Sequence, residues 1–172
     1  MTQGKKVSGG GESLAAGSTA PDFELEGVGP TGAETLSSRA LKGTPYLLYF
    51  YPRASTPGCT TQACDLRDHL AELRIPGGGE LKVLGVSPDG VSALEKFITK
   101  QALSFTLLSD QDHTLAEAYG VWVKKKLYGR EFMGIERSSF LIDAEGRIAA
   151  LKRKVRPAQH VAWVQEALAK LG

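Results

Sequence analysis

The chain has 172 residues, of which 42% are hydrophobic and 23% charged, and this composition is typical of one globular domain with a sizeable core. A net charge of +2 is too small to favour nucleic acid or an anionic membrane, and no apolar run approaches the ~18 residues of a membrane span. Two cysteines and three scattered histidines form neither a disulfide framework nor a tetrahedral zinc pattern.

The N-terminus is rich in glycine and serine, so we predict a flexible tail over residues 1–18 and a single domain over residues 19–172. The tail lacks the apolar core of a signal peptide. We therefore expect a cytoplasmic protein, whose thiols are reduced at rest.

The first half of the chain predicts a β-rich start, a buried strand, a helix and a second buried strand. Their expected ranges are 22–28, a strand near 35–36, 46–51, 59–73 and 81–87. The helix is indicated by apolar residues at intervals of three and four, and the run "PGGG" ends it.

The second half predicts a helix, a strand, a short helix, a β-hairpin around "AEG" and a final helix that Pro157 opens. Their expected ranges are 92–101, 105–109, 112–119, 137–143 with 147–155, and 157–171. Because the hairpin must be antiparallel, the pattern predicts an α/β fold: a mixed central sheet flanked by helices, after an N-terminal β extension.

Both cysteines lie in one short stretch, "YFYPRASTPGCTTQACDLRD". Cys59 follows the buried strand and a Thr-Pro-Gly turn and stands at the start of the predicted helix. Free N–H groups and the positive end of the helix dipole stabilise a thiolate there. Thr56 adds a hydroxyl, and Pro52 and Pro57 stiffen the loop. The alternative is that Cys59 is a small buried hydrophobe.

The pattern PxxxTxxC, formed by Pro52, Thr56 and Cys59, resembles the active site of peroxiredoxins, and the longer run "TPGCTTQAC" is similar to the bacterioferritin comigratory protein, or PrxQ, subfamily. The later run "MGIERSSFLID" also matches a family segment and contains Arg137. The resemblance covers roughly residues 20–171 and implies a thioredoxin-like fold and a thiol-dependent peroxidase that serves antioxidant defence.

The resemblance also implies roles for these residues. Cys59 attacks hydrogen peroxide or an organic hydroperoxide and becomes a sulfenic acid. Thr56, the first N–H groups of the helix and Arg137 hold the peroxide oxygens; the alternative for Arg137 is a surface salt bridge. Cys64 resolves the sulfenic acid as an intramolecular disulfide, which a thioredoxin or glutaredoxin system reduces again. No cofactor or metal is needed, and no partner subunit, so a monomer is expected.

The spacing of the two cysteines predicts a conformational change. In a continuous α-helix, two Cα atoms five residues apart are separated by about 8.6 Å. A disulfide tolerates at most about 7 Å between Cα atoms. We therefore predict a folded helix in the reduced protein and an unwound first turn in the oxidised one.

Three rival functions remain open. A thioredoxin-type oxidoreductase would carry CxxC, and a copper chaperone on this fold would carry CxxxC with a distal histidine, whereas this chain has CxxxxC. The third is a non-catalytic interaction domain with incidental cysteines. For His69, His113 and His160 we expect surface or core roles. Phe132 and Met133 could form an apolar collar for the organic group of a peroxide.

Overall fold

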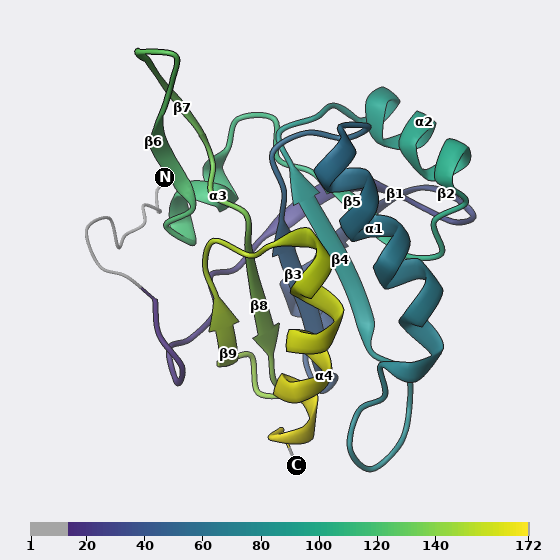
Figure 1. The fold of residues 1–172 in the computed structure, drawn as a ribbon. Helices are drawn as coiled ribbons and strands as arrows, with labels where there is room; N and C mark the ends of the chain where they lie inside the picture. The colour runs from purple at the N-terminus through teal and green to yellow at the C-terminus, as the bar shows by residue number, and fades with distance from the viewer. Residues whose placement is uncertain (1–13, 172) are drawn as a thin grey trace.

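The computed structural model describes residues 14–171. Its centre is a seven-stranded sheet with the strand order β2-β1-β5-β4-β3-β8-β9 (Figure 1). The strands are β1 (Glu24–Gly29), β2 (Gly32–Ser37), β3 (Tyr46–Phe50), β4 (Lys82–Ser87), β5 (Thr106–Ser109), β8 (Ser138–Ile142) and β9 (Ile148–Lys152). The helices are α1 (Pro57–His69), α2 (Val91–Gln101), α3 (Thr114–Ala118) and α4 (His160–Ala169), with 3₁₀ turns η1 (Ser38–Leu41), η2 (Leu70–Glu72) and η3 (Pro157–Gln159).

The sheet is mixed, as predicted. β3 pairs in parallel with β4 and antiparallel with β8, and β4 pairs in parallel with β5. The β8–β9 hairpin and the β1–β2 hairpin are both antiparallel. The carboxyl end of β3 therefore lies beside the amino end of β8, although the two are far apart in the sequence.

Every residue of strand β3 is buried, so both faces of the strand are covered. Successive side chains of a strand point to opposite sides. Leu47 and Tyr49 accordingly join the core cluster that contains residues of α1, α2 and α4, whereas Leu48 and Phe50 join the cluster that contains residues of α3. In Figure 1, α1 and α4 lie in front of β3 and β4.

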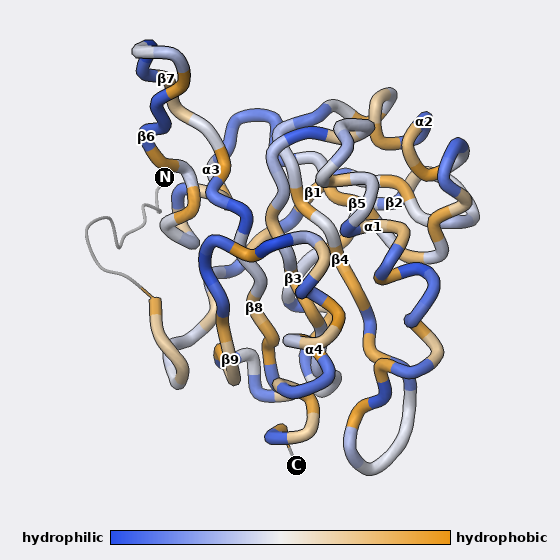
Figure 2. The backbone as a smooth tube through the Cα atoms, in the orientation of Figure 1, coloured by the Kyte–Doolittle hydropathy of each residue, from blue (hydrophilic) through white to orange (hydrophobic). Residues whose placement is uncertain are grey.

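The predicted helices are present, with small shifts at their ends. Helix α1 begins at Pro57, which suits the first helical turn because its missing N–H needs no partner there. It ends at His69, and the last residues of the predicted helix form the 3₁₀ turn η2. Figure 2 shows hydrophobic and hydrophilic residues alternating along α2, which is the amphipathic pattern that predicted it.

One hairpin was not predicted. β6 (Trp122–Leu127) and β7 (Arg130–Ile135) form a two-stranded antiparallel sheet that projects from the main body (Figure 1). Tyr128 and Gly129 connect the strands with φ angles of 52° and 79°, and two left-handed residues make the tight turn that favours hairpins. The hairpin was missed because most of its residues are at least partly exposed, so its sequence lacks the apolar alternation of a core strand.

Residues 1–13 of the predicted tail lie outside the described residues. The tail was expected to extend to residue 18, but Gly17 donates its backbone N–H to the Ile148 carbonyl at 2.8 Å, and Ile148 donates back to the Ser18 carbonyl at 2.8 Å. Residues 17 and 18 are thus hydrogen-bonded to the start of β9. No helix in the described part of the chain is long and apolar enough to cross a membrane.

Candidate active site

The loop that follows β3 is tied to the neighbouring strands. Tyr51 donates its backbone N–H to the Val86 carbonyl at 3.1 Å, and Ala54 donates to the Asp89 carboxylate at 2.7 Å. Ser55 has a φ of 65°, a left-handed conformation that non-glycine residues rarely adopt. These contacts hold the loop in a strained shape that directs the chain from β3 into α1.

Cys59 is the third residue of α1, and its side chain is only 2% exposed. Thr56 is the N-cap residue in an extended conformation, and its hydroxyl donates to the Arg53 carbonyl at 2.8 Å. The N–H groups of Gly58 and Cys59 belong to the first helical turn, so they have no intrahelical acceptor. Cys59 therefore combines a low-dielectric surrounding with the positive end of a helix dipole.

Arg137 reaches this turn from the neighbouring strand. Phe50 at the end of β3 pairs with Ser138 at the start of β8, which places Arg137 beside the active-site loop. Its Nη1 donates to Oε1 of Gln62 at 2.6 Å. A Cβ atom on Gly58 would lie 3.2 Å from Nη2 of Arg137. The guanidinium thus lies against the backbone of the residue that precedes Cys59.

A buried polar network continues behind Gln62. Nε2 of Gln62 is 3.0 Å from Nδ1 of His160, and Nε2 of His160 is 2.8 Å from Oγ of Ser139. All three side chains are fully buried. Burial, and secondarily the charge of Arg137, lower the pKa of His160 to about 3. One signal of this network is visible in the sequence, because Gln62 is a polar residue on the apolar face of α1, between Cys59 and Leu66.

Tyr49 and Tyr51 pack in the same core cluster as Cys59. The Tyr49 ring lies 5.3 Å from the His160 ring and 5.5 Å from the Tyr51 ring, measured between centroids. Burial raises the pKa of both phenols, and that of Tyr46 to about 12. Tyr49 and Tyr51 therefore stay neutral in the core cluster that contains Cys59, whereas Tyr46 lies in the cluster on the other face of the sheet.

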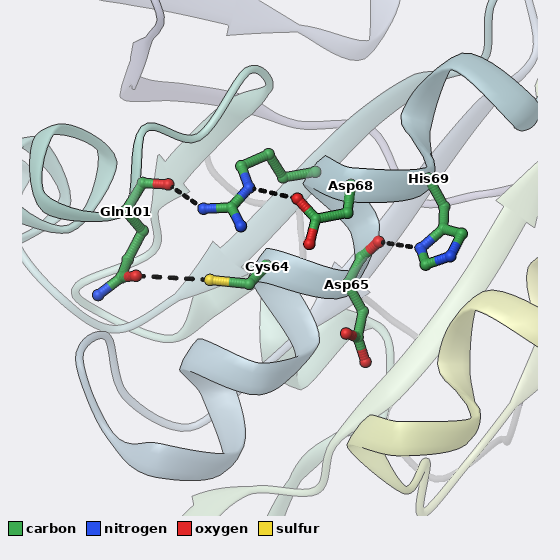
Figure 3. Close-up of polar contacts among 6 residues, drawn as sticks. Cys64, Asp65, Asp68, His69 and Gln101 are labelled. Carbon is green, nitrogen blue, oxygen red and sulfur yellow. Dashed lines mark hydrogen bonds and ion pairs between the residues drawn. The ribbon is translucent and has the colours of Figure 1, made fainter.

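Cys64 is partly buried and points toward α2 (Figure 3). Its thiol donates to Oε1 of Gln101 at 3.4 Å. Arg67, one turn further along α1, donates from Nη1 to the backbone carbonyl of Gln101 at 2.5 Å and from Nε to Asp68 at 2.8 Å. Both cysteines are free thiols, and α1 is continuous through both, so the reduced protein has the folded helix that the spacing predicted.

The unpredicted hairpin contributes Lys125 to the surroundings of the site. Burial and the neighbouring charge of Arg137 lower the pKa of Lys125. Phe132 and Met133, the expected apolar collar, are about half exposed on β7. His69 and His113 are partly exposed and His160 is in the core, as expected. Within residues 14–171, no group of three or more His, Cys, Asp or Glu side chains could hold a metal ion.

A buried free cysteine between the central strand and a helix, with an arginine from the residue before β8 near the same turn, fits a thiol enzyme on a thioredoxin-like α/β fold. Comparison with known proteins shows the family to which this chain belongs. A model of the AhpC/TSA family matches residues 16–151, and the chain belongs to this family.

Curated relatives refine the assignment to the Bcp peroxiredoxins. Peroxiredoxin Bcp of Bacillus subtilis is 48% identical over 158 residues, which cover 90% of this chain and 95% of the relative. Peroxiredoxin Bcp of Escherichia coli K12 is 42% identical over 157 residues, which cover 89% and 97%.

Solved structures agree. Peroxiredoxin Q of Xanthomonas campestris is 40% identical with a TM-score of 0.76, and the match covers 86% of this chain and 92% of that one. PrxQ of Xylella fastidiosa is 31% identical with a TM-score of 0.82, covering 92% and 98%. The predicted family and thioredoxin-like fold are confirmed, and the protein is an antioxidant peroxidase with a redox-active thiol. This rules out the rival thioredoxin-type, copper-chaperone and non-catalytic functions as its primary role.

Proposed function

We propose that the protein reduces hydrogen peroxide and organic hydroperoxides through a Cys59 sulfenic acid, which Cys64 resolves as an intramolecular disulfide. The observation that carries this proposal is the position of Cys59, buried in the first turn of α1 with the Arg137 guanidinium beside Gly58. The Cys59 sulfur and the Arg137 guanidinium, a cation that can stabilise developing negative charge, are thus both next to the first turn of α1.

In the first step, the Cys59 thiolate attacks one peroxide oxygen and the O–O bond breaks. The sulfur is oxidised to a sulfenic acid, and the leaving oxygen takes a proton to become water or an alcohol. Arg137 and the N–H groups of the first helical turn stabilise the charge on that oxygen. The Thr56 hydroxyl already donates to the Arg53 carbonyl, so its oxygen accepts the O–H of the peroxide. Pro52 ends β3 and helps to fix the loop.

In the second step, the Cys64 thiol displaces the hydroxyl of the sulfenic acid, which leaves as water, and a disulfide forms. The folded helix holds the two Cα atoms about 8.6 Å apart, beyond the reach of a disulfide. Resolution therefore requires α1 to unwind from its N-terminal end through Cys64, with loss of the contact between Cys64 and Gln101. Arg67 lies beyond Cys64, so its contact with the end of α2 anchors the remaining helix.

An external dithiol then reduces the disulfide by thiol exchange, and we propose a thioredoxin or glutaredoxin system for this role. Because both cysteines are in one chain, the cycle needs no second subunit, and we propose that the protein acts as a monomer. Size-exclusion chromatography with light scattering tests this; a stable dimer in both redox states would contradict it.

The Cys59→Ser and Cys64→Ser variants test the cycle. With thioredoxin and its reductase, Cys59→Ser loses peroxide consumption, and unchanged turnover would overturn the assignment. Cys64→Ser still consumes one equivalent of peroxide and accumulates a sulfenic acid that dimedone traps. If its oxidised form instead turns over with thioredoxin at the wild-type rate, Cys64 is not the resolving residue.

Organic peroxides are a second substrate class that the hairpin supports. The bacterioferritin comigratory protein of Xanthomonas campestris, whose solved structures are described in terms of alkyl peroxide reduction activity, is 39% identical, with a TM-score of 0.75 over 84% of this chain and 90% of its own. Here Phe132 and Met133 expose apolar surface on β7, which ends two residues before Arg137.

We predict that Phe132→Ala raises KM for cumene hydroperoxide roughly five- to tenfold, because burial of an aromatic ring contributes about 1 kcal/mol or more to binding an organic group. KM for hydrogen peroxide stays unchanged, since this small substrate does not reach the ring. Leu127→Ala, at the tip of the same hairpin, is the matched control. If Phe132→Ala changes KM equally for cumene hydroperoxide and for hydrogen peroxide, the proposed binding of the organic group by Phe132 is contradicted.

A further inference from the structure

The buried network behind Gln62 has no role in the steps above, yet it connects directly to Arg137. We propose that His160 is a positioning residue for the peroxide reaction, which holds Arg137 beside the first turn of α1 through the side-chain amide of Gln62. The proposal rests on the role of Arg137 in the proposed function, and it adds a residue 23 positions further along the chain, on α4.

The contacts fix the direction of every hydrogen bond in the network. The guanidinium of Arg137 can only donate, so Oε1 of Gln62 is the atom that faces it. The amide nitrogen of Gln62, which can only donate, then faces Nδ1 of His160. Nδ1 must therefore be the unprotonated ring nitrogen, and Nε2 carries the proton that it donates to Ser139. Three donors point the same way, from Arg137 to β8.

The neutral ring that this network requires is the one that the surroundings favour. His160 is completely buried, and the nearby charge of Arg137 further opposes a second positive charge; together they lower its pKa to about 3. A proton on Nδ1 would set two N–H groups against each other. His160 is consequently an acceptor toward Gln62 throughout the physiological pH range.

The network also closes on itself, which gives it rigidity. It begins at Arg137 and ends at Ser139, two residues later at the start of β8, after passing through α1 and α4. The His160 ring is packed between Tyr49, at 5.3 Å, and Trp163, at 6.4 Å and nearly parallel. Gln62 cannot rotate away from Arg137 without leaving its own buried amide unpaired, which is costly.

This arrangement addresses a physical requirement of the reaction. Arginine is long and flexible, and a donor stabilises a transition state only if it is already in place when charge develops. Solvent can reach Arg137, which is partly exposed, but it does not reach the three residues behind it. A dry network of fixed polarity therefore orients the guanidinium more strictly than water could.

Two substitutions of His160 test the acceptor. His160→Phe keeps a ring between Tyr49 and Trp163 but removes Nδ1, whereas His160→Asn places an oxygen acceptor near the position of Nδ1. The measurements are the single-turnover rate constants of Cys59 with hydrogen peroxide and with iodoacetamide, which needs no guanidinium. We expect His160→Phe to slow the peroxide reaction roughly tenfold or more without slowing alkylation, and His160→Asn to recover most of the loss. If His160→Phe and His160→Asn react with hydrogen peroxide at the same rate, the proposal is overturned.

A double-mutant cycle separates this proposal from the proposed function. If His160 acts through Arg137, then His160→Phe has no further effect in an Arg137→Ala background. If Arg137→Ala itself leaves the peroxide rate unchanged, the proposed role of Arg137 fails. If Arg137→Ala is slow but His160→Phe slows both backgrounds by the same factor, only the role of His160 fails. Should His160→Phe not fold, Ser139→Ala removes the far end of the network, and its smaller loss must likewise disappear without Arg137.

Discussion

At the level of single residues, Gly58 leaves room for the Arg137 guanidinium beside the first turn of α1. The residue lies in a helix, where alanine is intrinsically preferred over glycine by roughly 1 kcal/mol. Its φ angle is not left-handed, so the backbone does not require glycine. The space beside it is tight, because a Cβ atom would stand 3.2 Å from the Arg137 guanidinium, whereas its distance of 3.6 Å to Pro157 would be ordinary contact.

Gly58→Ala should therefore separate activity from stability. We expect the second-order rate of Cys59 oxidation to fall roughly tenfold as Arg137 is displaced, while the free energy of unfolding stays the same or rises by up to about 1 kcal/mol. Stopped-flow oxidation and urea denaturation measure the two quantities. Thr61→Ala, on the exposed side of the same helix, is the control that should leave oxidation unchanged. A wild-type oxidation rate in Gly58→Ala would show that the guanidinium position is not critical.

At the level of secondary structure, the proposed cycle requires two states of α1. While folded, it buries Cys59, presents its first N–H groups and carries Gln62 into the network with Arg137 and His160. To form the proposed disulfide, it would have to open over the turns between the thiols. In this proposal, the contact of Arg67 with the end of α2 limits the opening to the N-terminal part of the helix.

A pair of substitutions at Thr61, between the two cysteines and exposed, tests the opening. Alanine and glycine at a helical position differ by about 1 kcal/mol, which corresponds to a roughly fivefold change in an opening equilibrium. We expect the disulfide to form roughly fivefold faster in Thr61→Gly than in Thr61→Ala. Quenched-flow mass spectrometry after one equivalent of peroxide follows the step. The same pair at exposed Glu95 on α2 should show no difference; equal rates at Thr61 would mean that the helix does not open during resolution.

At the scale of the whole molecule, burial of His160 makes the stability of the fold depend on pH. The folded-state pKa of about 3 lies below the ordinary value of 6.5, so the unfolded chain binds the proton more tightly. Between these values acidification favours unfolding, by about 1.4 kcal/mol per pH unit. Above pH 6.5 the ring is neutral in both states, and this contribution to stability is constant.

We therefore predict that the wild-type protein loses about 2 kcal/mol of unfolding free energy between pH 6.5 and pH 5 that His160→Phe does not lose. Urea denaturation at several pH values measures the difference between the two proteins. Taking the difference cancels the contribution of His69, whose pKa is raised and which acts in the opposite direction. Parallel pH dependences would show that His160 is protonated in the folded state.

The sequence alone predicted the order of strands and helices in the core, because core elements carry apolar patterns of period two or near 3.6. It also determined the family, since Pro52, Thr56, Cys59 and Arg137 lie in motifs that can be recognised without coordinates. It did not predict the β6–β7 hairpin, whose pairing depends on backbone hydrogen bonds and a left-handed turn rather than on a buried face.

The assembly of the site depends on contacts between segments that are far apart in the sequence. The antiparallel pairing of β3 with β8 brings Arg137 to the first turn of α1, and no spacing along the chain could specify that approach. Likewise, Gln62, His160 and Ser139 come from three elements and have no shared motif, so their hydrogen bonds exist only once α1 and α4 pack on the sheet. Local patterns identified the candidate thiol, whereas long-range packing placed the groups that surround it.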